Sequence, residues 1–118
     1  METILVTDDD DACRDTIQRT LEREGYLVES VAGVDDALNA IQRKRFDLIV
    51  CDYWMRGKTG FDLLGELQKQ GPQIPVLMVS ACSDPMLETL VAKLGAAGLL
   101  RKPFRRQDLI ASITLALP

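Results

Sequence analysis

The sequence predicts an α/β fold: a single doubly wound (βα)5 domain whose five-stranded parallel sheet carries helices on both faces. Two observations predict it. Short apolar runs alternate with amphipathic helical patterns five times along the 118 residues. The run at residues 47–52 is too continuously apolar for a half-exposed strand, which is typical of parallel strands covered on both faces. We therefore expect one domain that spans residues 1–118 and binds ligands outside the carboxyl ends of its strands.

The individual elements follow from apolar spacing and from the residues that interrupt it. Gly71 and Pro72 break one helical pattern, and Asp84 and Pro85 suit the start of the next. The expected buried stripe of that next helix is Leu87, Leu90, Val91 and Leu94. We expect strands at residues 4–7, 26–31, 47–52, 75–80 and 98–102. We expect helices at residues 11–24, around 34–41, and at 61–70, 85–94 and 108–117.

Composition excludes several classes of function. The net charge is −4, so direct nucleic-acid binding by this domain is not expected. No apolar run reaches the length of a membrane span, and Glu2 follows Met1 where a signal peptide would begin. These features favour a cytoplasmic protein without membrane contact.

Cysteine and histidine usage narrows the chemistry. The three cysteines, Cys13, Cys51 and Cys82, are odd in number and widely spaced, so we expect small buried side chains and no disulfide framework. The chain contains no histidine. This excludes His-ligated zinc, Ser-His or Cys-His catalysis and a phosphohistidine carrier.

A run of four aspartates, Asp8 to Asp11, follows the first apolar run. Adjacent carboxylates repel each other, most strongly where the protein lowers the local dielectric. A hard cation such as Mg²⁺ would relieve that repulsion, because it prefers oxygen ligands. An acidic turn or a helix N-cap explains the same residues without a metal. The run alone leaves both interpretations open.

Polar residues also end the other apolar strands. Asp8 and Asp9 follow the first, Asp52 ends the third, Ser80 ends the fourth and Lys102 ends the fifth. Each alone is explained by a turn or a solvated charge. Their coincidence at one edge of a parallel sheet favours a functional site.

This set of side chains suits phosphoryl transfer to a carboxylate. Asp52 would be the nucleophile, and it needs no general base because a carboxylate is ionised at pH 7. Mg²⁺ held by Asp9 and Asp52, together with the Lys102 ammonium, would neutralise charge on the phosphoryl oxygens. The Ser80 hydroxyl could donate a further hydrogen bond.

Four segments resemble the response-regulator receiver domains of two-component signalling. They are ILVTDDDD at the first strand, DLIVCDYWMRGKTGFDLL at the third, PVLMVSA at the fourth and GAAGLLRKPF at the fifth. The resemblance covers essentially the whole chain and agrees in spacing as well as in identity. It implies the flavodoxin-like strand order 2-1-3-4-5 and a cis peptide before Pro103.

The resemblance also implies a role for each site residue. Asp52 would be the phosphoacceptor, Ser80 the switch hydroxyl and Lys102 the phosphate-binding lysine. Magnesium would be bound directly by Asp9, Asp52 and the backbone carbonyl of Trp54, with Asp8 acting mainly through water.

Three positions depart from the family pattern. Leu99 stands where an aromatic residue is usual, which puts the usual coupling between hydroxyl and aromatic ring in doubt. Arg56 stands where proline is common, and Thr59 where Asp or Asn is common. The last two affect the loop after Asp52 rather than the chemistry.

The function expected from these residues is a phosphorylation switch, not an enzyme beyond its own phosphotransfer and slow self-dephosphorylation. A partner histidine kinase or histidine phosphotransfer protein would donate the phosphoryl group. The surface made by residues 85–94, 98–102 and 108–117 would then act on an output domain or a downstream protein.

Two alternatives remain. One is a Mg²⁺ phosphatase of the haloacid dehalogenase type, although Trp54 replaces the second Asp of those enzymes and 118 residues leave little room for a cap domain. The other is a degenerate receiver that serves only as a scaffold. An FMN-binding module is rejected because four aspartates would repel the FMN phosphate.

Overall fold

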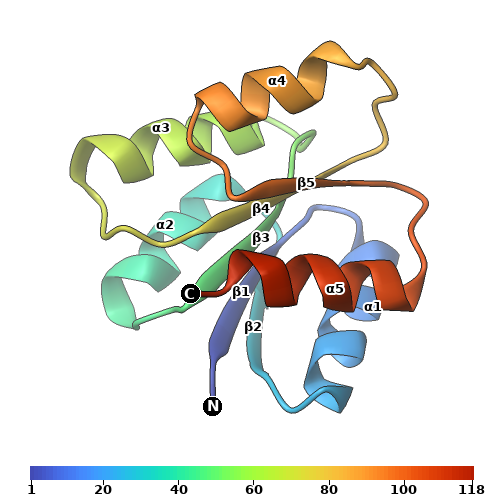
Figure 1. Ribbon diagram of the computed structural model, residues 1–118. Coiled ribbons are helices and arrows are strands. Elements are labelled where there is room, and N and C mark those ends of the chain that lie inside the picture. Colours follow the sequence, from blue (N-terminus) through green and yellow to red (C-terminus); the bar gives the residue numbers. More distant parts are fainter.

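The computed structural model describes residues 1–118, with every side chain except that of Gln70, and strands alternate with helices throughout (Figure 1). The strands are β1 (Thr3–Thr7), β2 (Leu27–Val31), β3 (Leu48–Asp52), β4 (Val76–Ser80) and β5 (Gly98–Arg101). The helices are α1 (Asp11–Arg23), α2 (Val34–Arg43), α3 (Gly60–Gln70), α4 (Met86–Lys93) and α5 (Arg106–Ala116). One parallel sheet contains all five strands in the order β2-β1-β3-β4-β5. The predicted fold class and strand order are confirmed.

Two apolar cores lie on opposite faces of the sheet. In Figure 1, α1 and α5 cover one face, and α2, α3 and α4 cover the other. Alternate residues of β1 face opposite cores: Ile4 and Val6 pack with α1 and α5, whereas Leu5 packs with the three other helices. Every residue of β3 is buried, which confirms the prediction of a strand covered on both sides.

The ends of the elements differ from the predicted ends by one or two residues. Helix α4 is assigned from Met86, not from residue 85, although the Asp84 carboxylate accepts the Met86 backbone N–H at 2.9 Å, as an N-cap does. Helix α5 begins at Arg106, two residues earlier than expected. Differences of this size are ordinary at frayed helix ends.

Two burial predictions were wrong. Leu90 of α4 is 44% exposed, because Leu87 and Val91, one turn apart, already fill the contact of this short helix with the sheet. Cys82 is exposed, because it lies in the β4–α4 loop beyond the end of the buried strand. Cys51 is buried as expected, and Cys13 is half-buried.

The parallel register brings the carboxyl ends of the central strands together. Thr7 pairs with Cys51, Asp52 with Val79, and Ser80 with Arg101. The residues that end β1, β3, β4 and β5 therefore lie along one edge of the sheet. Among the described residues, no helix is long and apolar enough to cross a membrane.

Candidate phosphoacceptor site

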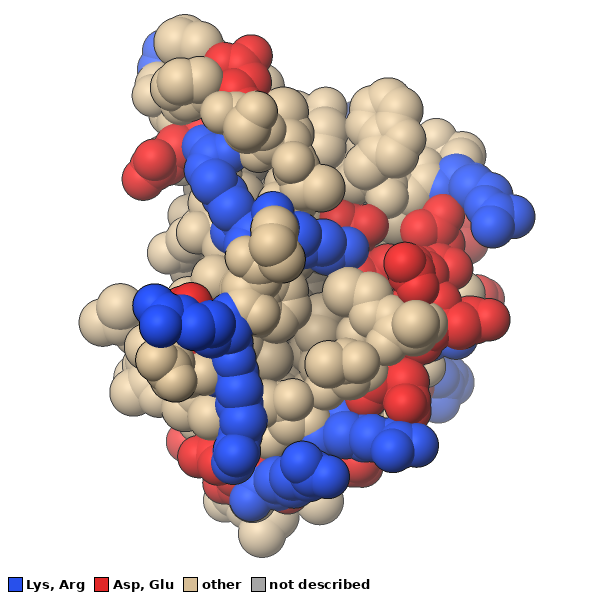
Figure 2. Space-filling model, turned by 90° about the vertical axis from the view of Figure 1, so that its right-hand side faces the viewer, with Lys and Arg blue, Asp and Glu red and all other residues tan. Residues whose placement is uncertain are grey.

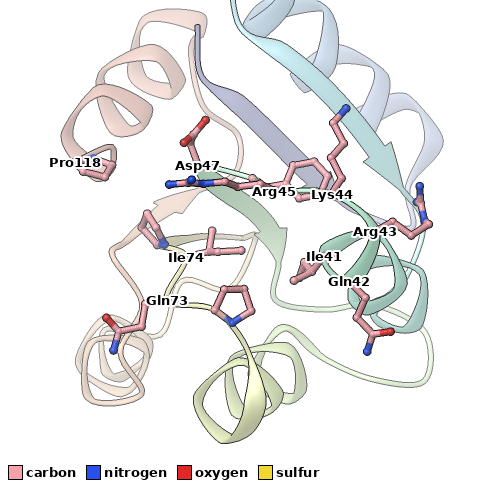
Figure 3. A pocket seen from close by; sticks show the side chains of 12 residues that line it. Ile41, Gln42, Arg43, Lys44, Arg45, Asp47, Gln73, Ile74 and Pro118 are labelled. Carbon is pink, nitrogen blue, oxygen red and sulfur yellow. The ribbon is translucent and has the colours of Figure 1, made fainter.

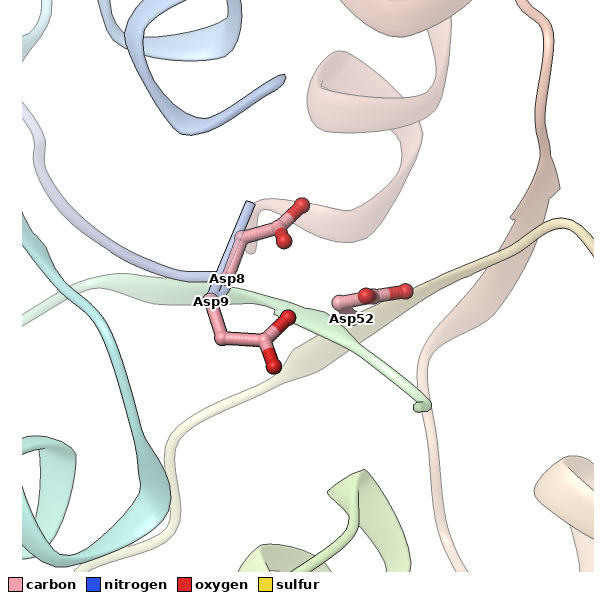
Figure 4. Close-up of side chains that lie close together, drawn as sticks. All are labelled: Asp8, Asp9 and Asp52. Atoms are coloured by element: carbon pink, nitrogen blue, oxygen red, sulfur yellow. The ribbon is translucent and has the colours of Figure 1, made fainter. Parts of the chain in front are cut away.

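The polar residues predicted from the strand ends do meet at the carboxyl edge of the sheet. Asp8 directly follows β1, Asp52 and Ser80 are the last residues of β3 and β4, and Lys102 directly follows β5. Figure 2 views the molecule from the side that is on the right in Figure 1, and acidic side chains gather there with basic side chains beside them. Figure 4 shows the carboxylates of Asp8, Asp9 and Asp52 directed toward a common region.

Asp8 is the most deeply buried of the acidic residues, with 1% of its surface exposed. One carboxylate oxygen accepts the Asp10 backbone N–H at 2.9 Å, and the other accepts Lys102 Nζ at 3.2 Å. The Asp8 carbonyl accepts Nη1 of Arg14 at 2.8 Å. A buried carboxylate needs such partners, so Asp8 is held in place by the fold itself.

Asp9 is more open and faces the loop that follows β3. Its Oδ2 accepts the Arg56 backbone N–H at 2.9 Å, and the Arg56 Nε lies 3.7 Å from the same oxygen. Asp8, Asp9 and Asp52 each contribute one oxygen to a group whose members all lie within 4.8 Å of one another. Three hard oxygen donors at this spacing fit a divalent cation of the Mg²⁺ type.

Asp52 is 8% exposed and lies 3.5 Å from Lys102 Nζ. Burial and, after it, the nearby Asp8 carboxylate raise the pKa of the Asp52 carboxyl, and Lys102 opposes them, so that the net pKa is about 6. Burial lowers the pKa of Lys102, but the Asp52 and Asp8 carboxylates outweigh this, so its net pKa is raised. The ammonium is therefore charged at neutral pH and placed between two carboxylates.

Ser80 and Trp54 occupy opposite extremes of exposure. Ser80 is 2% exposed, and its hydroxyl oxygen accepts the Cys82 backbone N–H at 3.0 Å. The Trp54 side chain is 72% exposed, and its ring lies 5.9 Å from the Tyr53 ring, centroid to centroid. The Lys102–Pro103 peptide is cis, as the resemblance implied.

The four consecutive aspartates have different roles in the structure. Asp8 and Asp9 belong to the carboxylate cluster. Asp10 is the N-cap of α1, where its side chain accepts the backbone N–H groups of Ala12 and Cys13. Asp11 is exposed and pairs with Arg14 at 2.5 Å. The N-cap interpretation is confirmed for Asp10, whereas Asp8 and Asp9 have the spacing that the metal interpretation requires.

The loop after Asp52 turns sharply into α3. Thr59 caps that helix in a reciprocal arrangement, in which the Asp62 carboxylate accepts the Thr59 backbone N–H at 2.6 Å. Gly60 packs so tightly that a Cβ there would come within 3.0 Å of the Asp52 carbonyl oxygen. The departure at Thr59 from the family pattern thus supplies a helix cap.

Three arginines that touch this region were not predicted as site residues. Arg14 contacts Asp8, Arg56 contacts Asp9, and Arg101 donates to the backbone of the β4–α4 loop. In the sequence, Arg56 is marked by its departure from the family pattern, and Arg101 was expected only as part of the surface that a partner reads. The contacts of Arg14 and Arg101 depend on side-chain conformations that strand and helix patterns do not reveal.

Comparison with known proteins identifies the family. Residues 4–114 match the response regulator receiver domain. The chain is 37% identical over 115 residues to the DNA-binding transcriptional regulator NtrC of Rhizobium meliloti. The aligned region covers 98% of this chain and 24% of that protein. It spans about a quarter of the length of that relative and of two others, a Bradyrhizobium NtrC and an Azorhizobium NtrX.

Solved structures agree. The chemotaxis response regulator CheY4 of Vibrio cholerae superposes with a TM-score of 0.92 at 32% identity, over 99% of both chains. The receiver domain of NtrX from Brucella abortus superposes with a TM-score of 0.91 at 34% identity, over 97% of both chains. The sequence match, the shared fold and the acidic group at the sheet edge lead to one conclusion: this chain belongs to the response regulator receiver domain family.

Proposed function

We propose that this receiver domain is a phosphorylation-activated switch that accepts a phosphoryl group on Asp52. The observation that carries the proposal is the environment of Asp52: a nearly buried carboxylate, next to two others, with Lys102 Nζ at 3.5 Å. A structural carboxylate at a strand end does not require this concentration of like charge. A nucleophile that must receive a dianionic phosphoryl group does require such a site, in which cations neutralise the negative charge.

The transfer requires no additional base. An oxygen of the ionised Asp52 attacks phosphorus, the phosphorus–nitrogen bond of a donor phosphohistidine breaks, and its electron pair returns to the imidazole. Because the chain has no histidine, the donor is a partner histidine kinase or histidine phosphotransfer protein. The Asp52 pKa of about 6 leaves most of the nucleophile ionised at pH 7.

Different residues of this chain would bind the metal ion and the phosphoryl group. Mg²⁺, when bound, supplies positive charge to a phosphoryl oxygen and offsets the carboxylate repulsion. Asp9, Asp52 and the Trp54 carbonyl would hold the ion directly. Asp8 would act through water, which fits with the hydrogen bonds that already engage both of its carboxylate oxygens.

Lys102 and Ser80 act on the phosphoryl group itself. The Lys102 ammonium turns from Asp8 toward a phosphoryl oxygen and stays close to Asp52. The Ser80 hydroxyl donates to another oxygen, and its neighbour Cys82 moves with it. The result is a changed surface on α4, β5 and α5, which a downstream protein or an output domain recognises.

The relatives point to the kind of output. NtrC of Rhizobium meliloti is a DNA-binding transcriptional regulator about four times the length of the part matched here. We infer that DNA contact, where this switch controls transcription, belongs to a partner or an attached unit. The net charge of −4 does not favour binding of DNA by the receiver domain.

Intact-protein mass spectrometry tests the proposal. Incubation with a small phosphodonor and Mg²⁺ should add one phosphoryl group to the wild-type chain and none to Asp52→Ala. Asp47→Asn is the matched control, because Asp47 lies at the opposite end of β3 and should leave phosphorylation unchanged. Undiminished phosphorylation of Asp52→Ala would refute the assignment. Release of many phosphates per chain would instead favour the phosphatase alternative.

A further inference from the structure

Arg101, the last residue of β5, ties this strand to the β4–α4 loop at residues 81–85. Its Nη1 donates to the carbonyl of Cys82, and its Nη2 donates to the carbonyl of Asp84 at 3.2 Å. A guanidinium suits this role, because its planar fork can serve two acceptors at once. These two bonds attach the loop to the edge strand of the sheet.

The position of Arg101 follows from the alternation of side chains along β5. Leu100 packs with the core under α1 and α5, whereas Leu99 packs with the core under α4. Arg101 lies two residues after Leu99 in the strand and therefore faces the same side of the sheet, the side that α4 covers. Leu99 offers no hydrogen-bonding group, so on this side of β5 Arg101 supplies the polar contact with the loop.

The same loop is attached to the phosphoacceptor site through a hydrogen bond of Cys82. The backbone N–H of Cys82 donates to the Ser80 hydroxyl at 3.0 Å, and the carbonyl of Cys82 accepts from Arg101. Both polar groups of the Cys82 backbone are thus engaged, one with the site and one with β5. If Ser80 and its neighbours shift toward a phosphoryl group, the Arg101 bonds must lengthen or break.

We propose that Arg101 is a positioning residue that holds the β4–α4 loop in its unphosphorylated arrangement and is released when Asp52 is phosphorylated. The inference rests on the proposed function and extends it to regulation of the same site. A contact that exists in only one of two states opposes the change by its own free energy. The released guanidinium then becomes available on the surface of α4, β5 and α5 for an acidic group of a partner.

The test compares Arg101→Met with the wild type. Methionine keeps much of the side-chain length and removes every donor. Arg105→Met is the control, because Arg105 is an exposed arginine nearby whose ion-pair partner is Asp108 and not the loop. Arg101→Lys keeps the charge but loses the two-armed geometry, so it should behave as an intermediate.

Two measurements are made on each variant in full-length form. Hydrogen exchange, followed by mass spectrometry, reports opening of the loop peptide that contains residues 81–85. Calorimetry gives the affinity for beryllofluoride in the presence of Mg²⁺. Two exposed hydrogen bonds correspond to a change of about fivefold in each quantity.

We expect Arg101→Met to exchange about fivefold faster without ligand and to bind beryllofluoride about fivefold more tightly, with Arg105→Met like the wild type. A merely structural role predicts faster exchange with equal or weaker binding, and that result would overturn the inference. Unchanged exchange would also overturn it. If the wild type is phosphorylated but Arg101→Met binds no more tightly, only this inference fails. If the wild type takes no phosphoryl group, the proposed function fails first and this inference with it.

Discussion

The carboxyl and amino ends of the sheet differ in how deeply their charged side chains are buried and in how these side chains are paired. At the carboxyl end, Asp8, Asp52 and Ser80 are almost fully buried, at 1%, 8% and 2% exposure. Buried there as well is the Thr7 hydroxyl, which finds no hydrogen-bond partner among the described residues. Like charges and an unsatisfied polar group are therefore concentrated where water is scarce. Such an arrangement destabilises the fold unless a ligand relieves it.

The amino end of the sheet is hollowed, and its charges are arranged differently. A cavity of about 580 Å³ there is lined by the end of α2, the α2–β3 and α3–β4 connections, and Pro118 (Figure 3). Of its basic residues, Arg43 and Lys44 pair with Glu29 at 3.1 and 3.9 Å. The Asp47 carboxylate accepts the Thr3 backbone N–H at 2.8 Å. Opposite charges here meet in open, solvated positions.

Crowded carboxylates, rather than the size of a hollow, make the carboxyl end the place where we expect a cation to bind. At the amino end, Arg43 and Lys44 lie beside Glu29, so a bound cation would relieve no comparable repulsion there. The crowded end keeps carboxylates together against their mutual repulsion. The same substitution should therefore have a large effect at one end and almost none at the other.

The largest expected effect comes from the two lysines. Lys102→Ala removes the cation between Asp8 and Asp52 and should lower the free energy of unfolding at pH 7 by about 3 kcal/mol, because buried carboxylates lose their partner. Lys44→Ala removes a half-exposed lysine at the amino end and should cost less than about 0.5 kcal/mol. Urea unfolding of both variants measures the difference. Equal losses would contradict the contrast between the two ends.

Magnesium should stabilise the carboxyl end alone. At a hundredfold excess over its dissociation constant, a ligand of the folded state adds about 2.7 kcal/mol to the free energy of unfolding. Asp9→Asn should make the metal-free protein slightly more stable, through reduced repulsion, and remove most of the Mg²⁺ effect. Asp47→Asn at the amino end should retain it. Thermal unfolding with and without Mg²⁺ decides the question, and a full Mg²⁺ shift in Asp9→Asn would exclude Asp9 as a direct ligand.

The pH dependence of stability should come from Asp52. Its pKa is about 6 in the folded chain against an ordinary value of 3.8, so the folded state binds this proton more tightly. In metal-free buffer, the resulting stabilisation is complete below about pH 4 and is lost as the pH rises through about 6. Asp52→Asn has no carboxyl group at this position and therefore lacks this pH-dependent contribution to the free energy of unfolding. The wild-type free energy of unfolding should therefore fall relative to Asp52→Asn between these pH values, and parallel curves would contradict the raised pKa.

The convergence of the candidate site residues could be predicted from the sequence, because strand ends determine where these residues lie. Once Asp52, Ser80 and Lys102 end parallel strands of one sheet, their convergence follows from topology. The local partners do not follow in this way. The Arg101 bonds to Cys82 and Asp84 depend on the path of a loop, and the exposure of Leu90 depends on how few residues a two-turn helix can bury.

The smallest expected effect is optical and uses Trp54, the only tryptophan. Its side chain is 72% exposed, and its ring lies beside that of Tyr53, the residue that directly follows Asp52. Because most of the ring already contacts water, ligands can change its fluorescence only by altering the Tyr53 contact and the local field. Mg²⁺ should therefore produce a small, saturable change in intensity, and beryllofluoride a second one. Both should vanish in Asp52→Ala, whereas Lys102→Ala should keep the first and weaken the second, since the ammonium contacts phosphate rather than metal. Arg45→Ala, at the amino end, should keep both. A flat Mg²⁺ titration at millimolar concentration would show that this loop is indifferent to the metal and would remove the support for Trp54 as a ligand.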